Sequence, residues 1–163
     1  MKSNLIFPEV VIKISDSFSD HRGDLFTIFK NGDYNNMLFN HDKVSISKKN
    51  VLRGLHGDNI AHKLITCLSG EVLLVVVDNR KTSKNYLKWD SIILSEKNRV
   101  QILVPPMFAN GHLVLSDSAT FFYKWSYEGD YPDVSDQFSL KWNDSRIGIK
   151  WPITNPILAE RDK

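Results

Sequence analysis

The chain has 163 residues, 42% of them hydrophobic and 25% charged, which is enough to bury the core of one domain spanning residues 1–163. A formal net charge of +2 at pH 7, with no run of Lys or Arg, argues against a nucleic-acid partner. The single cysteine, Cys67, excludes a disulfide framework within one chain and is expected to be a small core residue.

The first apolar segment, NLIFPEVVIKI, does not have the pattern of a secretory signal. Pro8 and Glu9 interrupt it, and no small-residue cleavage site follows. The longest apolar run, VLLVVV at 72–77, is far shorter than the roughly 20 residues of a transmembrane helix. We therefore expect no membrane association and a cytoplasmic location.

Short β-rich segments recur along the chain, separated by turn residues such as NGD at 31–33, PP at 105–106 and EGDYPD at 128–133. No window keeps apolar residues at helical spacing for three turns, so helix should be scarce. Ten short strands without a βαβ rhythm predict an all-β fold, and a jelly roll fits best. In chain order the expected strands lie near 9–14, 25–30, 37–47, 51–56, 63–69, 71–78, 90–94, 99–104, 111–116 and 119–126.

The segment NVLRGLHGDNIAHKL, residues 50–64, is unusually rich in titratable side chains. In a strand over 51–56 the side chains alternate, which places His56 on one face and Arg53 on the other. Taken singly, each such residue is more often a structural or surface group than a functional one. Their clustering makes the segment a candidate site; the residues are Arg53, His56, Asp58, His62 and Lys63.

One interpretation of this segment is a metal site. His56 and Asp58 form an H-x-D pair, and with the distant His112 they imitate the two-His-one-carboxylate triad of iron oxygenases. Such oxygenases usually carry an Arg about ten residues beyond the distal histidine, where this chain has Phe122. The H-x-H plus Glu spacing of metal-binding cupins is also missing, so we expect no metal.

The other interpretation is acid–base chemistry beside a carbonyl group. Proton removal from a carbon next to a ketone needs a base, a group that stabilises the enolate oxygen and an acid that returns a proton. His56 suits the base, Lys63 suits the oxyanion, and TFFYKWSY offers Tyr123 or Tyr127 as the acid. Tyr123 fits equally well as a core aromatic, and spacing alone does not choose between these interpretations.

Several segments, in one consistent order, resemble the dTDP-4-dehydrorhamnose 3,5-epimerase family of nucleotide-sugar enzymes. The resemblance implies a cupin-type jelly roll (a double-stranded β-helix), usually a homodimer, that needs no metal or redox cofactor. It also implies inversion of C3, C5 or both in a nucleotide-diphospho-4-keto-6-deoxy sugar. The segments are FSDHRGDLF (18–26), NVLRGLH (50–56), KLITCLSGEVLLVVVDNRKTS (63–83), LSEKNRVQILVPPMFANGH (94–112), FFYK (121–124), WNDSRIGIKWP (142–152) and PILAERD (156–162).

The resemblance assigns four catalytic roles. His56 would remove the proton beside the C4 ketone, and Asp162 would hold the far ring nitrogen of that histidine. Lys63 would stabilise the enolate oxygen. Tyr123 would return a proton from the opposite face, which inverts the carbon.

The resemblance also assigns substrate-binding roles. Arg53 would bind the pyrophosphate, and Tyr131 would line the sugar or base pocket. Arg22 would reach the nucleotide of the neighbouring subunit, so that the dimer forms part of the site.

Two departures from the family pattern fall close to these positions. Asn110 replaces the histidine of the usual F-A-H-G-F, and Leu74 stands where the family often has an aspartate. We infer that a second His–carboxylate pair is lost jointly, because an unpaired buried carboxylate would be costly. His112, two residues beyond Asn110, is either a substitute imidazole at the substrate or a packed core histidine.

Further departures concern the nucleotide and the sugar. His41 and Lys43 stand where Gln and Asn are usual, and Thr27 stands where Glu is usual. This altered pattern resembles a branch that acts on GDP-linked 4-keto-6-deoxy-heptoses in capsule synthesis. The alternatives are a cupin nucleotide-sugar 3,4-ketoisomerase, which usually has a second histidine close behind the first, a non-haem iron dioxygenase, and a non-catalytic sugar-binding jelly roll.

Overall fold

The structure, a computed structural model, describes residues 5–163. It is built almost entirely from short strands, with two single-turn 3₁₀ helices. No helix within residues 5–163 is long and apolar enough to cross a membrane. The elements are β1 (Val11–Ile14), β2 (Ser17–Asp20), β3 (Gly23–Phe26), β4 (His41–Lys48), β5 (Leu52–Gly57), β6 (His62–Ser69), β7 (Glu71–Asp78), β8 (Trp89–Ser95), β9 (Val100–Val104), β10 (Phe108–Val114), β11 (Ser118–Ser126), η1 (Val134–Asp136), β12 (Phe138–Ser139) and η2 (Glu160–Asp162).

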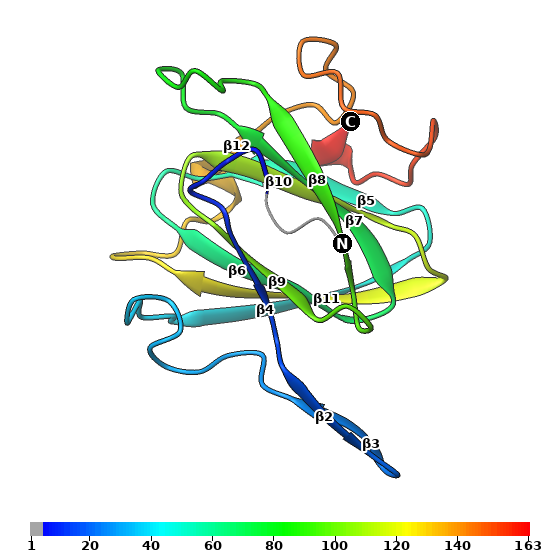
Figure 1. Ribbon diagram of the computed structural model, residues 1–163. Helices are drawn as coiled ribbons and strands as arrows, with labels where there is room; N and C mark the ends of the chain where they lie inside the picture. Colours follow the sequence, from blue (N-terminus) through cyan, green and yellow to red (C-terminus); the bar gives the residue numbers. More distant parts are fainter. Residues whose placement is uncertain (1–4) are drawn as a thin grey trace.

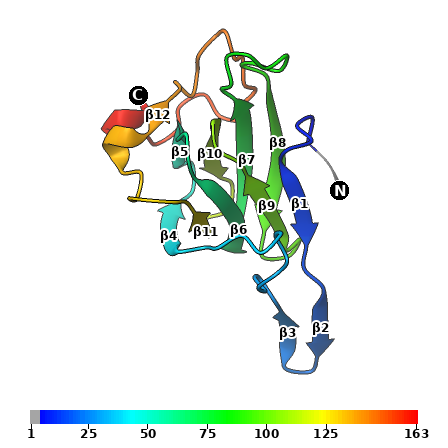
Figure 2. The same ribbon diagram turned by 90° about the vertical axis from the view of Figure 1, so that its left-hand side faces the viewer.

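Two five-stranded antiparallel sheets face each other (Figure 1). Their strand orders are β1-β9-β6-β11-β4 and β12-β5-β10-β7-β8, so that most consecutive strands lie in opposite sheets. A separate hairpin, β2–β3, projects from the body of the molecule (Figure 2). The prediction of an all-β jelly roll of the cupin type is confirmed.

The run EVLLVVVD fits the interior position of β7 in its sheet, between β10 and β8. Both faces of this strand are covered, so every position has to be apolar rather than every second one. Leu74 and Val76 point into the main core between the sheets, whereas Val75 and Val77 pack on the outer side against Ile147 from the C-terminal segment. Each such buried side chain contributes about 1.5–3 kcal/mol.

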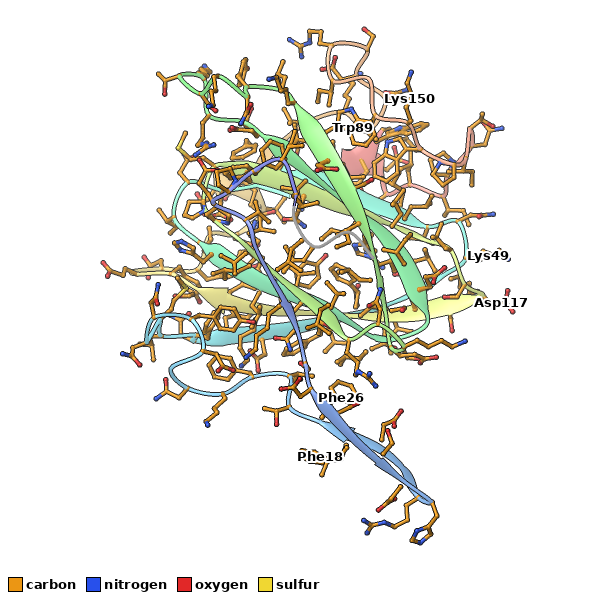
Figure 3. All side chains as sticks on the ribbon, viewed as in Figure 1. Phe18, Phe26, Lys49, Trp89, Asp117 and Lys150 are labelled. Atoms are coloured by element: carbon orange, nitrogen blue, oxygen red, sulfur yellow. The ribbon has the colours of Figure 1, made fainter. Side chains whose placement is uncertain are left out.

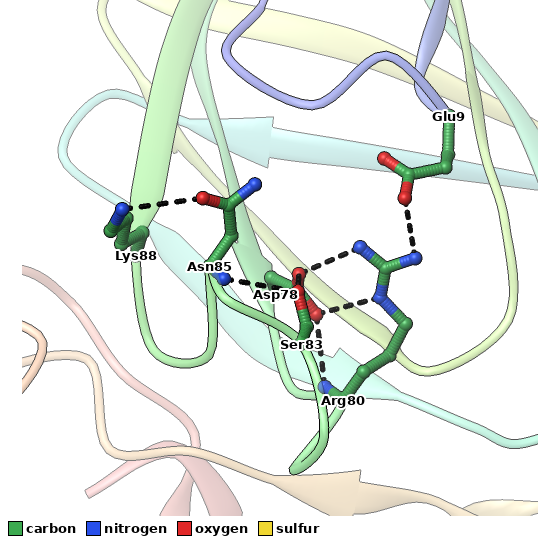
Figure 4. Close-up of polar contacts among 6 residues, drawn as sticks. All are labelled: Glu9, Asp78, Arg80, Ser83, Asn85 and Lys88. Carbon is green, nitrogen blue, oxygen red and sulfur yellow. Dashed lines mark hydrogen bonds and ion pairs between the residues drawn. The ribbon is translucent and has the colours of Figure 1, made fainter.

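The N-terminal segment closes one end of the core. Phe7 is fully buried and meets Phe108 edge to face, with 5.3 Å between ring centroids. A polar network fastens the same segment from outside (Figure 4): Arg80 donates to Glu9 at 2.6 Å and to the buried carboxylate of Asp78 at 2.7 Å.

Several predicted elements differ from the observed ones. The strand expected at 25–30 is β3, which lies earlier in the chain, is two residues shorter and pairs with β2, for which no strand was predicted. The strand expected at 111–116 begins earlier, at Phe108. The two-residue β12 was also missed. Both β2 and β12 are short and largely polar, so they have no apolar alternation to reveal them; pairing with a neighbouring strand defines them.

Cys67 is buried in β6, as expected for a small core residue. Burial raises the pKa of its thiol to about 11, so the thiol stays protonated at neutral pH.

Candidate active site

A cavity of about 370 Å³ opens between the two sheets on the side where the C-terminal turn η2 lies against β5. Figure 2 shows this turn beside β12 and β5. The walls combine cationic, aromatic and hydrogen-bonding side chains from β4, β5, β6, β10 and β11 with two later segments. The lining residues are Lys43, Val44, Ser45, Arg53, His56, Lys63, Asn110, Tyr123, Trp125, Tyr131, Val134, Gln137, Ala159, Arg161 and Asp162.

The R-G-L-H motif delivers two side chains to this cavity because β5 contains a bulge. Asn110 pairs with His56 and His112 with Arg53, so two residues of β5 oppose the single Gly111 of β10. The expected alternation, with Arg53 and His56 on opposite faces, is therefore wrong: both line the cavity.

Glycine is required at the bulge. Gly54 has φ of +119°, and a Cβ there would lie 2.6 Å from Gly111 Cα. Gly54 is therefore needed for the backbone conformation of the motif and not for a side-chain function.

An imidazole–carboxylate pair spans 106 positions of the chain. His56 Nε2 lies 2.7 Å from Asp162 Oδ1, and Nδ1 lies 2.9 Å from the hydroxyl of Ser139 on β12. The Asp162 side chain is only 4% exposed and the His56 side chain 20%. Because a carboxylate only accepts, Nε2 carries the hydrogen and the basic lone pair is on Nδ1, where Ser139 donates.

Tyr123 reaches the cavity from the opposite sheet. It lies on β11, whereas His56 lies on β5, so the phenol and the imidazole come from the two facing walls. Burial raises the pKa of the Tyr123 phenol well above its ordinary value, with Arg53 opposing the shift. A phenol in this environment is a proton donor at neutral pH.

Lys63 is a buried cation on the cavity wall. Its residue is 4% exposed, and Nζ lies 2.8 Å from Asp58 Oδ2 and 4.5 Å from the centre of the Trp125 ring. Burial lowers the pKa of the ammonium, while Asp58 raises it.

Asp58 therefore pairs with a lysine, not with His56 as the metal interpretation required. Among residues 5–163 no group of three His, Cys, Asp or Glu side chains is arranged to hold a metal ion.

Three buried polar atoms on the cavity wall have no hydrogen-bond partner in the described part of the chain. They are Asn110 Oδ1, Ser45 Oγ and Trp125 Nε1. Buried polar groups are nearly always satisfied, so their convergence on one cavity indicates a ligand with several hydrogen-bonding groups. Asn110 was expected at the substrate; Ser45 and Trp125 were missed.

His112 does not reach the cavity wall. It faces the same interior as Asn110 but pairs with Leu74, one step deeper in the barrel, and is fully buried. Its ring stacks on Phe121 with 3.9 Å between centroids, and burial lowers its pKa to about 3. Its position is that of a neutral packed ring, which favours the packed core histidine over the substitute imidazole at the substrate.

The remaining predicted residues lie at the rim or away from it. Lys43 contacts the Tyr131 hydroxyl and lies 4.5 Å from the centre of that ring; both side chains line the cavity. His41 packs against Tyr131 just outside the cavity, with 4.5 Å between ring centroids and the rings tilted by 33°. Arg22 pairs with Asp20 on the projecting hairpin and does not line the cavity of its own chain.

Sequence reasoning missed other residues of the site. Arg161 donates to Gln137 at 3.3 Å, and both line the cavity next to Asp162. Arg161 adjoins Asp162 in the motif PILAERD, so its position was accessible from the sequence. Gln137 and Ser139 lie in a polar segment without periodicity, where no local pattern distinguishes them.

The chain is similar to known proteins over nearly its whole length. The family model described as dTDP-4-dehydrorhamnose 3,5-epimerase matches residues 4–163. The dTDP-4-dehydrorhamnose 3,5-epimerase of Salmonella typhimurium is 39% identical over 95% of this chain and 88% of its own length.

Solved structures show the same likeness. The dTDP-6-deoxy-D-glucose-3,5-epimerase RmlC of Legionella pneumophila, in complex with dTDP-4-keto-L-rhamnose, superposes with a TM-score of 0.90 at 34% identity, over 98% of this chain and 87% of that one. The dTDP-4-dehydrorhamnose 3,5-epimerase of Bacillus anthracis, with TDP and PPi bound, has a TM-score of 0.91 at 30% identity, over 98% and 94%.

Proposed function

Because the chain belongs to the dTDP-4-dehydrorhamnose 3,5-epimerase family, we propose that it is an isomerase that inverts C3, C5 or both in a nucleotide-diphospho-4-keto-6-deoxy sugar. The observation that carries the proposal is the pairing of His56 with Asp162 on one wall of a cavity whose facing wall holds Tyr123.

The C4 ketone of such a sugar acidifies the neighbouring C–H bonds. The Nδ1 lone pair of His56 takes this proton, for which the Ser139 hydroxyl has to turn away, and Asp162 stabilises the imidazolium. The Lys63 ammonium stabilises the enolate oxygen. The Tyr123 phenol then protonates the carbon from the other face, and exchange with solvent restores the phenol and the neutral imidazole.

The charge and shape of the cavity support a nucleotide-sugar substrate. Lys43, Arg53 and Arg161 line it and suit a diphosphate, which accepts charge-assisted hydrogen bonds. The unpartnered atoms of Ser45, Asn110 and Trp125 suit sugar hydroxyl groups.

The nucleotide is proposed to be dTDP in the first instance, because the relatives described above are named for dTDP sugars. The comparisons give no support to a GDP-linked heptose, a 3,4-ketoisomerase or an iron dioxygenase.

We further propose a homodimer in which Arg22 reaches the partner's cavity. Exposed apolar side chains on the hairpin support this. Phe18, labelled on the hairpin in Figure 3, is 80% exposed, and Leu25 is 74% exposed. On the edge strand β4, Ile46 is 73% exposed. One domain over residues 1–163 and a cytoplasmic location are also proposed; light scattering and cell fractionation test the dimer and the location.

The test is incubation with a dTDP-4-keto-6-deoxy sugar in heavy water, followed by proton NMR. We expect loss of the H3 signal, the H5 signal or both, together with the coupling constants of the inverted ring. His56→Asn should abolish both changes. The matched control is His62→Asn, which removes a β-strand histidine that does not line the cavity. Full exchange by the His56 variant would exclude the mechanism.

A further inference from the structure

We infer that Asp58 is a positioning residue for this reaction: it holds the Lys63 ammonium at the cavity wall. The inference rests on the proposed function, because it concerns the lysine that stabilises the enolate. Asp58 lies behind Lys63, does not line the cavity and had no role in the acid–base interpretation of the sequence.

The Asp58 carboxylate is fixed by its own loop. The residue is 2% exposed, and Oδ1 accepts the backbone amides of Ile60 at 3.0 Å and Ala61 at 2.6 Å. The Asp58 carbonyl oxygen accepts the Met107 amide at 2.7 Å. Main-chain bonds therefore set the position of the carboxylate, and Oδ2, which forms no hydrogen bond within residues 5–163, makes an ion pair with Lys63 Nζ at 2.8 Å.

Lys63 depends on this carboxylate for its charge. It is 4% exposed, with Asp58 on one side and the Trp125 ring 4.5 Å away. Burial and the nearby Lys43 lower the pKa of the ammonium, and Asp58 is the group that raises it. Asp58 is the only carboxylate paired with Lys63 among residues 5–163, and a buried cation deprived of it would lose its proton rather than stay charged.

The consequence for the reaction follows from the charge. Only the ammonium form can donate to an enolate oxygen, so the active enzyme requires protonated Lys63. Loss of the Asp58 charge lowers the pKa of Lys63. As the pH is raised, the variant should therefore lose activity at a lower pH than the wild type does. The alkaline limb of its pH profile moves toward neutrality.

The experiment compares Asp58→Asn with the wild type. Asparagine keeps one side-chain oxygen for the loop amides and replaces Oδ2, the charged acceptor beside Lys63 Nζ, with an uncharged NH2 group. We expect kcat near neutral pH to fall about 10- to 100-fold, KM to change by less than about 3-fold because the cationic groups that suit the diphosphate are intact, and the alkaline limb of kcat to shift to lower pH.

A matched control is Asp42→Asn. Asp42 also pairs with a lysine, Lys124, at 2.8 Å, but neither residue lines the cavity. This variant should retain the wild-type kcat and pH profile. An Asp58→Asn protein that is folded and has the wild-type kcat and profile would overturn the inference, because a purely structural role affects unfolding but not the titration of Lys63.

Lysine NMR separates this inference from the proposed function, because it needs no substrate. With ¹³C-labelled lysine, assigned by Lys63→Met, the Cε signal of Lys63 should titrate at lower pH in Asp58→Asn, or in Asp58→Ser as a second variant. An unshifted titration overturns the inference even if the enzyme is an epimerase. If neither variant folds, the chemical shift of the Asp58 carboxyl carbon in the wild-type protein is followed against pH instead. It should change with the same midpoint as the titration of Lys63. A carboxyl carbon that does not respond to this titration overturns the inference.

Discussion

At the scale of single residues, the site is defined by the partners of each ionisable group. His56 has a carboxylate beside one ring nitrogen and a hydroxyl beside the other, and Lys63 is paired with a buried carboxylate. Tyr123 has no partner within residues 5–163 that would lower the pKa of its phenol enough to ionise it. These surroundings give each group a different role: His56 removes a proton, Lys63 stays cationic, and Tyr123 keeps its proton to donate.

Asp162→Asn tests the first partnership. An amide of the same shape can donate to Nε2, which favours the wrong tautomer of His56 and no longer stabilises the imidazolium. We expect kcat to fall about 100- to 10,000-fold with an unchanged melting temperature. Turnover can be followed by proton NMR of the sugar. A variant with more than half of the wild-type kcat would contradict the assigned role.

Tyr123→Phe tests the donor. Proton removal by His56 remains possible, but nothing delivers a proton to the other face. We expect deuterium from heavy water to enter the substrate with retained configuration, while inversion slows by about 100-fold or more. Mass spectrometry measures the uptake and NMR the configuration. The control is Tyr127→Phe, which removes a phenol that does not line the cavity and should invert the sugar normally.

At the scale of elements, the bulge in β5 is the feature that makes the R-G-L-H motif functional. A regular strand would send Arg53 and His56 to opposite faces; the extra residue opposite Gly111 brings both into the cavity. In this motif a bulged backbone orients the side chains at its two ends, Arg53 and His56, toward the cavity.

Gly54→Ala tests the role of the bulge. The new methyl group would lie 2.6 Å from Gly111 Cα at a φ of +119°, so the bulge has to rearrange. We expect a loss of about 2 kcal/mol or more in the free energy of unfolding, together with most of the activity. Urea denaturation gives the stability.

The control for this variant is Gly23→Ala. Its φ of +123° is similar, but nothing lies within 4 Å of the added methyl group. It should cost roughly 1 kcal/mol without a steric clash. Equal costs for the two variants would show that close approach at the bulge is unimportant.

At the scale of the whole molecule, the hairpin and the edge strand β4 expose apolar side chains that one chain does not cover. A two-stranded ribbon is marginal by itself, so a partner surface for β2–β3 is expected. In the proposed dimer this contact would also carry Arg22 to a second cavity.

Ile46→Glu tests the dimer. A charge placed on the exposed face of β4, where this side chain is 73% exposed, should prevent burial against a second copy. We expect monomers by light scattering, and reduced kcat/KM if Arg22 of the neighbour completes the site. Val11→Glu on β1, the other edge of the same sheet, is the control and should stay dimeric.

The fold was predictable because strand periodicity is local. The apolar run 72–77 and the alternating segments around it follow from the two-residue repeat of a pleated strand, which depends only on neighbouring backbone geometry. Residue chemistry made His56, Lys63 and Tyr123 candidates, the resemblance of dispersed motifs gave them roles and added Asp162, and all four line one cavity. The strands that were not predicted, β2 and β12, are those without such a repeat.

The amino-acid sequence by itself determined the strand-rich class, the buried cysteine and the residue types available for proton transfer. Only the tertiary structure decided which of these groups meet. It paired Asp58 with Lys63, brought Arg53 and His56 to one face, and left His112 packed behind Asn110. The physical reason is that alternation is a property of adjacent residues, whereas these contacts depend on strand register, a bulge and the packing of segments as far apart as 106 residues.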